Sequence, residues 1–172
     1  LVVHARTKAH GYRPPAYWDR IADLRQCVKL PMVANGEIWT VADAIRCREV
    51  TGCNDIMIGR GMVNNPGLAL EIKFHDAQAQ GLSVSEMSQK FSWEQLWPLM
   101  SIFWRRMSLH VAPRHRVGRL KQWLNYLRRH YPEAQQAFDT LRLIQDPKVM
   151  EAWLLRPLPT FAPQPPLEVL SS

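Results

Sequence analysis

The first 75 residues alternate short apolar runs with segments whose apolar positions recur at helical spacing. Three of the runs are short and continuous, which is typical of buried strands. They fall at 1–3, 32–34 and 56–58. Two helices are predicted between them, one over 17–28 and one that Thr40 can cap and Gly52 can end. This alternation predicts parallel pairing with right-handed crossovers, and three strands are too few to close a barrel, so we expect a portion of a larger α/β domain.

From residue 83 onward the apolar pattern is helical throughout. Ser92 and Gln95 resemble a capping box that opens a helix, and Pro98 inside that helix predicts either a kink or a later start. A second helix is predicted over 114–131, where one face collects apolar side chains. That stripe consists of Leu120, Trp123, Leu124, Leu127 and Tyr131.

Prolines mark the remaining helices and the tail. Pro132 suits the first turn of a helix, and Asp146 followed by Pro147 is typical of a capped start. A polar stretch near 76–81 joins the helical part to the first half. We therefore expect an α/β portion at 1–75, an all-α bundle at 83–156 and an irregular proline-rich tail at 157–172.

The composition is that of a globular protein, with 47% hydrophobic and 22% charged residues. No apolar run approaches the roughly 18 residues that a membrane span needs, and no export signal begins the chain. The odd number of cysteines, Cys27, Cys47 and Cys53, has no metal-binding spacing and suits a reducing compartment. We therefore expect a cytoplasmic protein whose thiols are buried or idle.

The formal net charge is +7, and its distribution along the chain is uneven. Between residues 95 and 132 there is no acidic residue, whereas eight lysines and arginines fall in that window. A solvated helical surface normally carries both signs, so this window predicts a surface for a polyanionic partner. The alternative interpretation is that the charges only keep a bundle soluble.

Candidate chemistry follows the ends of the predicted strands. Asn35-Gly36-Glu37 comes directly after the second strand and Gly59-Arg60-Gly61 after the third. Glycines there let backbone N–H groups approach an anion, and an arginine adds forked donors, so the pair of turns predicts a phosphate site. In eight-stranded α/β barrels, phosphates are commonly bound after strands seven and eight. The alternative interpretation is a pair of ordinary strand-to-helix turns that need glycine for backbone shape alone.

The end of the first predicted strand carries His4-Ala5-Arg6-Thr7-Lys8. An imidazole and two cations at a strand's carboxyl end can contact a cofactor ring, a phosphate or a substrate. Taken alone, such a histidine is more often a satisfied structural residue.

These motifs, in this order, resemble the tRNA-dihydrouridine synthases. The segments that carry the resemblance are Leu-Val-Val-His-Ala-Arg-Thr-Lys with Gly-Tyr behind it, Pro-Met-Val-Ala-Asn-Gly-Glu-Ile and Asp-Ile-Met-Ile-Gly-Arg-Gly. In that family the set marks strands six, seven and eight of an FMN-binding TIM (β/α)8 barrel. The later segment Gly-Arg-Leu-Lys-Gln-Trp-Leu-Asn-Tyr-Leu-Arg-Arg resembles the RNA-binding helical domain of the bacterial class C branch, which modifies position 16 of tRNA. The resemblance implies the last strands and helices of such a barrel followed by a C-terminal helical bundle.

The resemblance also implies roles for individual residues. His4 is expected to contact the flavin and Tyr12 to touch tRNA. The residues expected on the ribityl phosphate side of FMN are Asn35, Gly36, Glu37, Gly59 and Arg60. The residues that fall on the RNA-reading segment are Arg116, Arg119, Lys121 and Gln122. Helical spacing independently places Lys121, Asn125 and Arg128 on one face beside the apolar stripe, which predicts Arg128 as a further RNA contact.

The reaction implied by the resemblance is flavin-dependent reduction of a uridine in the D-loop of tRNA to 5,6-dihydrouridine. A hydride passes from the reduced flavin to C6 of a flipped-out uridine, a cysteine donates the proton to C5, and NADPH reduces the flavin. That cysteine and a flavin-contacting lysine belong to earlier strands, before Leu1, so we expect this chain alone to be inactive. The implied partner is tRNA, and a monomer without an obligate protein partner is expected.

Two other interpretations remain open. A non-catalytic helical module that binds structured RNA needs the basic window but not the phosphate turns. Another phosphate-binding barrel enzyme with a metabolite substrate needs the turns, but it does not account for an acid-free basic stretch of this length.

Overall fold

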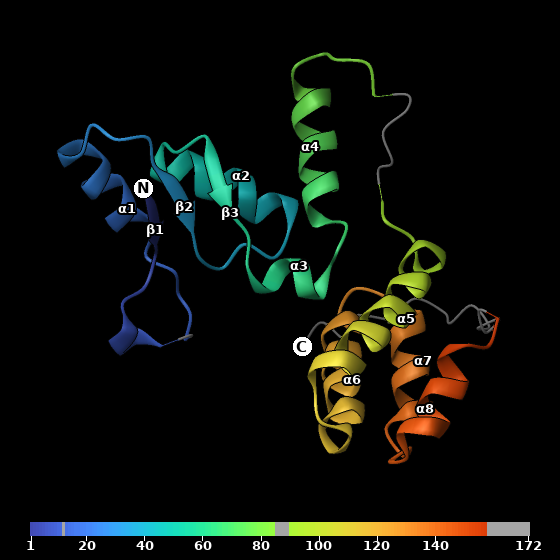
Figure 1. Ribbon diagram of the computed structural model, residues 1–172. Coiled ribbons are helices and arrows are strands. Elements are labelled where there is room, and N and C mark those ends of the chain that lie inside the picture. The colour runs from blue at the N-terminus through green and yellow to red at the C-terminus, as the bar shows by residue number, and fades with distance from the viewer. Residues whose placement is uncertain (12, 85–89, 158–172) are drawn as a thin grey trace, which may run out of the picture. The chain divides into compact units, whose positions relative to one another are not determined.

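The computed structural model describes residues 1–11, 13–84 and 90–157 (Figure 1). Apart from Pro157, the predicted tail at 157–172 lies outside the described residues. None of the described helices is both long enough and apolar enough to cross a membrane.

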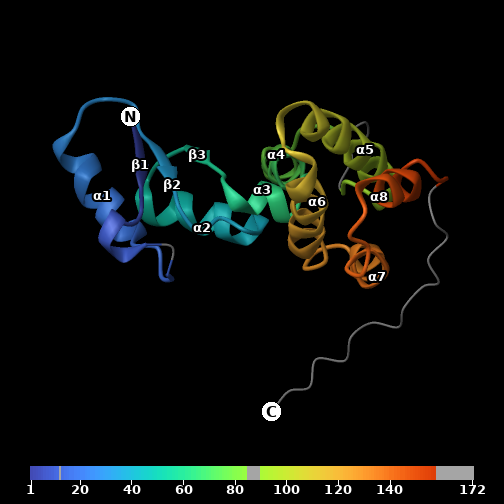
Figure 2. The same ribbon diagram turned by 60° about the horizontal axis from the view of Figure 1, so that its bottom comes forward.

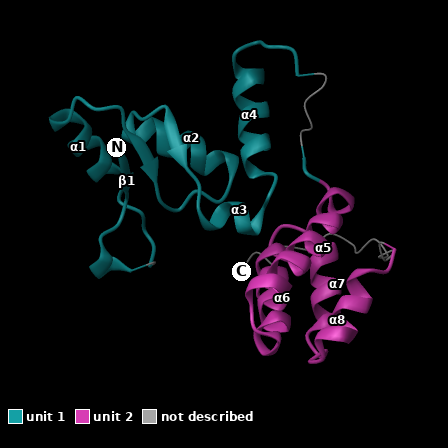
Figure 3. Cartoon of the chain, viewed as in Figure 1, with its two compact units in different colours: residues 1–91 teal, residues 92–172 magenta. Residues whose placement is uncertain are grey.

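The chain divides into two compact units, Leu1–Phe91 and Ser92–Ser172 (Figure 3). The first unit extends past residue 75, where the sequence predicts the end of the α/β portion, because a helix that crosses this point and ends at Ala79 packs on the unit. The assignment of the two units to a barrel end and an RNA-binding domain stays a prediction.

The first unit contains a three-stranded parallel sheet in the order β1-β2-β3. The strands are β1 (Val2–His4), β2 (Val33–Asn35) and β3 (Asp55–Met57). Pairing places His4 beside Asn35 and Asn35 beside Met57, so the three carboxyl ends lie at one edge of the sheet. The predicted parallel order is confirmed. Each strand is shifted by one residue from its apolar run, because the backbone pairing, and not the hydrophobic run, sets its ends.

Helical segments follow each strand of the first unit. They are the short 3-10 helix η1 (Lys8–His10) and the α-helices α1 (Trp18–Cys27), α2 (Val41–Thr51), α3 (Arg60–Asn64) and α4 (Leu68–Ala79). Thr40 caps α2, since its hydroxyl oxygen accepts from the Asp43 N–H while the Asp43 carboxylate accepts from the Thr40 N–H. Gly52 ends the helix in the left-handed conformation, at φ 65°. Both predictions for α2 are confirmed, because caps are local features of the sequence.

The predicted polar linker near 76–81 is wrong in its first part, because α4 continues through Ala79. Leu68 and Ile72 are buried on the inner face of α4. Arg48 of α2 donates from Nη1 to both carboxylate oxygens of Asp76, at 2.8 and 2.9 Å, which ties the polar end of α4 to the unit. An ion pair between distant helices leaves no mark in local polarity, so the sequence pattern does not predict it.

The second unit consists of four helices over its described residues. They are α5 (Trp93–His110), α6 (Pro113–Leu127), α7 (Pro132–Leu141) and α8 (Pro147–Leu154). Helix α6 contacts each of the other three and lies beside α7 in both Figure 1 and Figure 2. It buries Leu120, Leu124 and Leu127 completely, so the core of the unit forms around its predicted apolar stripe.

Helix α5 begins at Trp93, which confirms the capping box and rules out the later start near Pro98. The Ser92 hydroxyl oxygen accepts from the Gln95 N–H, and the Gln95 side chain accepts from the Ser92 N–H. Burial of Trp93 and Trp97 stabilises these first turns, which outweighs the lost N–H of the proline. A kink at Pro98 stays a prediction.

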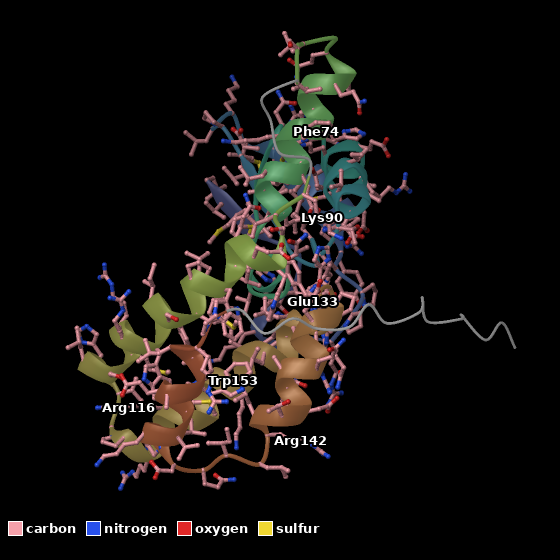
Figure 4. All side chains as sticks on the ribbon, turned by 90° about the vertical axis from the view of Figure 1, so that its right-hand side faces the viewer. Phe74, Lys90, Arg116, Glu133, Arg142 and Trp153 are labelled. Carbon is pink, nitrogen blue, oxygen red and sulfur yellow. The ribbon has the colours of Figure 1, made fainter. Side chains whose placement is uncertain are left out.

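Helix α6 ends earlier than the predicted 114–131, at Leu127. Tyr131 is extended, with φ −111° and ψ 114°, because the residue before a proline is driven out of the helical region. Tyr131 is nevertheless buried, as the stripe predicts. Trp123 is only half-buried and meets Phe103 of α5 edge-on at 4.9 Å. Trp97 meets Trp153 of α8 in the same way at 5.0 Å, and Figure 4 labels Trp153 within this unit.

Candidate functional site

A pocket of about 230 Å³ lies at the carboxyl ends of the three strands, and we call it the strand-end pocket. All six residues that the sequence predicts to bind the cofactor line it: His4, Asn35, Gly36, Glu37, Gly59 and Arg60. Five further residues complete its wall: Arg6, Ile38, Trp39, Met57 and Gly61. Parallel pairing accounts for this convergence, because it brings strand ends that are distant in sequence to one edge. The role of the six residues in cofactor binding stays a prediction.

Glu37 is the centre of the polar contacts in this pocket. Its Oε1 atom accepts hydrogen bonds from Arg6 and, at 3.1 Å, from Arg60. Its Oε2 atom accepts from the indole N–H of Trp39 at 3.0 Å. The Arg60 guanidinium also lies 5.2 Å from the centre of the Trp39 ring. Two arginines and one glutamate, which we call the charge cluster, give this part of the pocket a net charge of +1.

The backbone at the end of β2 is shaped to present Glu37. Gly36 has φ 132° and Glu37 has φ 53°, an uncommon value for a residue with a side chain. The indole N–H of Trp18 donates to the Gly36 carbonyl oxygen at 2.9 Å and holds the turn from the side of α1. A residue with a side chain keeps such a backbone conformation only where its surroundings fix it. Residues in such conformations cluster at functional sites.

The pKa of Glu37 lies below its ordinary value of 4.5. Burial alone raises this pKa, because it penalises the charged carboxylate. Hydrogen bonds from Trp39 and Arg6, together with the charges of Arg6 and Arg60, outweigh that effect and favour the ionised form. The carboxylate is therefore charged at neutral pH, and its lone pairs already serve three partners of this chain.

Arg6 lines this pocket, although the sequence indicated it only as one of two cations at the end of the first strand and not as one of the cofactor-binding residues. Its side chain is 1% exposed, and its Nε and Nη1 atoms are buried without a hydrogen-bond partner among the described residues. The preceding residue, Ala5, is buried as well. Arginine is almost never fully buried, so hydrophobic patterning places a charge at this position in solvent. The sequence feature that could have indicated a buried Arg6 was Glu37, the single acidic residue in the turn after the neighbouring strand.

The glycines of the two turns differ in what they do. A Cβ atom on Gly61 would stand 2.1 Å from the Ile38 carbonyl oxygen, so this glycine serves close packing. A Cβ atom on Gly59 would meet nothing within 4 Å, so its backbone faces open space. The structure therefore supports the shape-only interpretation for Gly61, and it leaves Gly59 free for a ligand to approach.

His4 and Asn35 face the pocket with polar atoms that this chain leaves accessible. The Nδ1 atom of His4 accepts from the Arg6 N–H at 3.1 Å. In the neutral ring the proton therefore sits on Nε2, which is the nitrogen left to donate to a ligand. Asn35 is half-buried, and its side-chain amide makes no hydrogen bond with a described residue.

The residues predicted to bind RNA are not gathered as the cofactor residues are. Tyr12 lies outside the described residues. Lys121 and Arg128 share one side of α6, as predicted, and both reach α7. Lys121 Nζ donates to the Arg142 carbonyl oxygen, at the C-terminal end of α7, at 2.7 Å. The Arg128 guanidinium lies 4.7 Å from the ring centre of Phe138.

The remaining predicted RNA residues lie on other parts of α6. Arg116 is half-buried, and its Nε donates to the Val111 carbonyl oxygen at 2.8 Å, just before α6 begins. Arg119 and Gln122 are exposed and contact each other at 3.2 Å. Figure 4 labels Arg116 and Arg142 on the second unit, well apart from each other. The predicted set therefore includes two sides of the helix, and its RNA contacts stay a prediction.

The acid-free window of the sequence is not free of acids in space. Arg128 donates to Gln135 of α7 at 3.3 Å, and Gln135 in turn donates to the Asp139 carboxylate at 2.9 Å. The Asp139 carboxylate therefore lies two hydrogen bonds away from Arg128, on the side of α6 that meets α7. A neighbouring helix supplies the acid, which a window along the chain cannot reveal.

The three cysteines are placed away from the strand-end pocket. Cys47 and Cys53 are buried, and desolvation is the main reason that the pKa of Cys47 rises to about 11. Cys27 is exposed at the end of α1, and its neighbours Gln26 and Val28 line a pocket of about 680 Å³. That larger pocket lies before β2 and β3, at the amino ends of the strands, where conserved chemistry is not usually found in barrels. The prediction of buried or idle thiols is confirmed for Cys47 and Cys53, whereas Cys27 is exposed.

A family model described as Dihydrouridine synthase (Dus) matches residues 1–147 of this chain, a range that includes parts of both units. Three relatives named tRNA-dihydrouridine(16) synthase illustrate the similarity. The protein of Pseudomonas putida is 50% identical over 146 residues, which cover 85% of this chain and 43% of the relative. That of Cupriavidus necator is 44% identical over 169 residues, which cover 96% of this chain and 48% of the relative. That of Neisseria meningitidis serogroup B is 34% identical over 146 residues, which cover 85% of this chain and 42% of the relative. The chain spans less than half the length of these relatives.

Proposed function

This chain belongs to the dihydrouridine synthase family, and from that premise we propose that it is the C-terminal part of a flavin-dependent tRNA-dihydrouridine synthase. In this proposal the complete protein reduces uridine 16 in the D-loop of tRNA to 5,6-dihydrouridine. The first unit is the end of an FMN-binding TIM barrel, and the second is a helical bundle that binds tRNA. The observation that carries the proposal is the strand-end pocket, where the six predicted residues meet.

The pocket fits the phosphate end of FMN in size and charge. Its volume of about 230 Å³ is below the roughly 300–1,000 Å³ of sites that enclose a whole small molecule, so it suits one end of the cofactor. The charge cluster contributes a net positive charge, and Arg60 is its more exposed cation. The open backbone of Gly59 and the amide of Asn35 add neutral donors that can approach a phosphate oxygen.

FMN, when bound, supplies the hydride that reduces the uracil ring. The residues of this chain bind and orient it. Arg60, Gly59 and Asn35 hold the phosphate side, and His4 presents its Nε2–H toward the flavin. Glu37, which is occupied by its own partners, acts through the two arginines and not as a direct ligand through its carboxylate.

The proton that completes the reduction comes from outside these 172 residues in this proposal. Cys47 is buried with a pKa of about 11, and Cys53 is buried beside the same helix end. Cys27 stands near the larger pocket at the amino ends of the strands, away from the strand-end pocket. None of the three is placed to protonate a base at the flavin, which supports the inactivity of this chain alone.

The second unit supplies the tRNA contacts in this proposal. Arg119 and Gln122 carry exposed polar groups on α6, and the family match extends through α7. Phosphate contacts from such cations position an RNA, and an amide can read a base edge. The resemblance alone supports the finer points, namely NADPH as reductant, a monomeric protein and a cytoplasmic location.

The proposal is tested with a chimera in which the Pseudomonas putida relative supplies the part of its chain that has no counterpart here. The chimera is expressed in a bacterial strain that lacks dihydrouridine at position 16, and tRNA digests are analysed by mass spectrometry. We expect dihydrouridine to return at position 16, and to be lost in the Asn35→Ala, Arg60→Ala double variant. Unmodified uridine 16 in cells that contain the folded, flavin-loaded chimera would contradict the proposed function.

A further inference from the structure

The outward side of α5 carries two arginines and two apolar side chains that form one patch. Ile102 and Leu109 lie three or four residues from each of Arg105 and Arg106, so helical geometry places the four on one side of the helix. They line a shallow pocket of about 200 Å³, and we call them the α5 face. The opposite side of α5 holds the side chains that are buried in the core of the second unit, among them Trp104.

The two arginines of the α5 face are not held by the protein. Both residues are exposed, and neither guanidinium makes an ion pair, a hydrogen bond or a ring contact with another described residue. On α6, by contrast, Lys121 donates to the carbonyl oxygen at the C-terminal end of α7, and Arg128 donates to Gln135. The α5 face therefore presents two cations that no carboxylate of the described residues pairs with.

The apolar members of the α5 face are open to solvent. Leu109 is 78% exposed and Ile102 is 44% exposed. Single exposed apolar side chains are common on protein surfaces, but these two share a pocket with two guanidinium groups. A surface that binds only phosphates needs donors and positive charge, and it gains nothing from aliphatic side chains. The mixture indicates a partner that offers both anionic and apolar surface.

An unpaired nucleotide offers both kinds of surface, because its phosphate is anionic and the faces of its base are apolar. Bases in single-stranded loops of RNA stack on arginine guanidinium planes, while neighbouring cations bind the phosphates. The two aliphatic side chains extend such a platform with further apolar contact. A lipid surface fits less well, because it would need the broad apolar side of α5, which is buried in the core.

We propose that the α5 face binds an unpaired nucleotide of the tRNA substrate. Arg105 and Arg106 contact the phosphates around that nucleotide, and Ile102 and Leu109 pack against its base. This inference rests on the proposed function, since it assumes that the second unit contacts tRNA. It adds a surface on α5 to the residues predicted on α6, and it separates cations that are available to RNA from cations that hold the bundle together.

The test measures the binding of folded tRNA, and of a fully paired RNA duplex, to the chimera described above at several salt concentrations. Arg105→Gln and Arg106→Gln each remove one charge of the α5 face. Arg142→Gln is their matched control, because it removes an exposed charge of the same unit that Figure 4 shows well away from the C-terminal half of α5. Leu109→Ser removes apolar surface, and Leu143→Ser, at a residue that is 76% exposed in the same unit, is its control.

We expect each variant of Arg105 and Arg106 to lower the log–log salt slope of tRNA binding by about 0.7–0.9, the value of one phosphate contact, whereas Arg142→Gln leaves it unchanged. Leu109→Ser should weaken tRNA binding by about fourfold or more, the effect of losing one buried CH2 group, without a change in slope. The same variant should bind the duplex within about twofold of the unaltered chimera, because a duplex offers no unstacked base. Leu143→Ser should stay within about twofold for both RNAs.

The failure of this inference can be told apart from the failure of the proposed function. Variants of Arg105 and Arg106 that match Arg142→Gln in slope, with helix content intact by circular dichroism, would overturn the inference and leave the α5 face to an acidic protein. A Leu109→Ser variant that weakens tRNA and duplex binding equally, or weakens neither, would also overturn it, since the face would then contact no unpaired base. In both cases an unaltered chimera that binds tRNA leaves the proposed function standing. A folded chimera that does not bind tRNA would contradict both.

Discussion

In the first unit, residues from three strand ends meet in one pocket, whereas in the second unit the predicted RNA residues make separate contacts around one helix. Glu37 joins Arg6, Arg60 and Trp39, which come from the ends of β1, β3 and β2. Lys121, by contrast, holds the end of α7. A parallel sheet gathers distant residues by its topology, while a helix only fixes the angle at which each residue leaves it. Sequence motifs that follow successive parallel strands are therefore better evidence for a shared site than motifs that lie along a helix.

The largest effect that can break this comparison is expected at Glu37. Replacing it by glutamine leaves the buried Arg6 without its counter-charge, which should destabilise the first unit by about 3 kcal/mol. Glu49→Gln, which alters an exposed pair with Arg46 in the same unit, should change stability by less than about 0.5 kcal/mol. Urea unfolding followed by circular dichroism, with hydrogen exchange to localise the change, measures both. Equal changes in stability for the two variants would contradict a central role of Glu37 in holding the charge cluster together.

The stability difference between the unaltered chain and Glu37→Gln should depend on pH, and the sign of that dependence can be predicted. Because the pKa of Glu37 is lowered on folding from 4.5, its contribution is fully present above pH 4.5. The contribution is lost as the pH falls through the folded pKa. The stability difference between the unaltered chain and Glu37→Gln should therefore shrink on acidification below pH 4.5. A difference that stays constant across that range would mean that the carboxylate charge is not what stabilises the cluster.

Substitutions at two glycines compare the close packing of the first unit's turn with the open surface of α6. Gly61→Ala forces a methyl group against the Ile38 carbonyl oxygen, and we expect a loss of about 2–3 kcal/mol in stability. Gly118 lies exposed within α6, and its added Cβ would meet nothing within 4 Å. Gly118→Ala should therefore stabilise the second unit by about 0.5–1 kcal/mol through helix propensity. Thermal unfolding of both variants tests this, and a destabilising Gly118→Ala would argue against an open surface on α6.

The smallest effects are expected for single RNA contacts on the two sides of α6. Arg119→Ala should reduce the log–log salt slope of tRNA binding by about 0.7–0.9, the value of one phosphate contact, without a change in stability. Lys121→Ala should change the slope less, and it should lower stability by about 0.5–1 kcal/mol because it removes a bond to the end of α7. Binding titrations at several salt concentrations, with thermal unfolding alongside, separate the two. A full slope change in Lys121→Ala with unaltered stability would assign the α7 side to the RNA.

Local signals in the sequence predicted most of the fold that carries the pocket. The Thr40 and Ser92 caps and the order of the strands follow from residues close together in the chain. Helix α4 as a whole was not predicted, and a polar linker was placed over its end, because the contact of Asp76 with Arg48 connects residues far apart in the sequence. The early end of α6 was recoverable from Pro132, since a residue that precedes proline avoids the helical region.

The candidate site divides in the same way. Six of the lining residues were predictable, because their motifs follow strands whose ends must meet. Arg6 was predicted only as a cation at the end of the first strand, and its burial was not, since hydrophobic patterning places an arginine in solvent. Trp39 was not predicted, because the pattern gives a tryptophan no polar role. The link from Arg128 through Gln135 to Asp139 could not be predicted from the basic window, because Asp139 comes from another helix.

The central claim is that the strand-end pocket holds the phosphate side of FMN. The most direct measurement is the FMN affinity of the chimera, purified with its flavin, beside that of the Asn35→Ala, Arg60→Ala double variant. Arg60→Ala alone should weaken FMN binding by about tenfold to a hundredfold, as expected for a hydrogen bond to a charged group, and the double variant should lose the yellow flavin absorbance on dialysis. Full retention of FMN by a folded double variant would contradict the account.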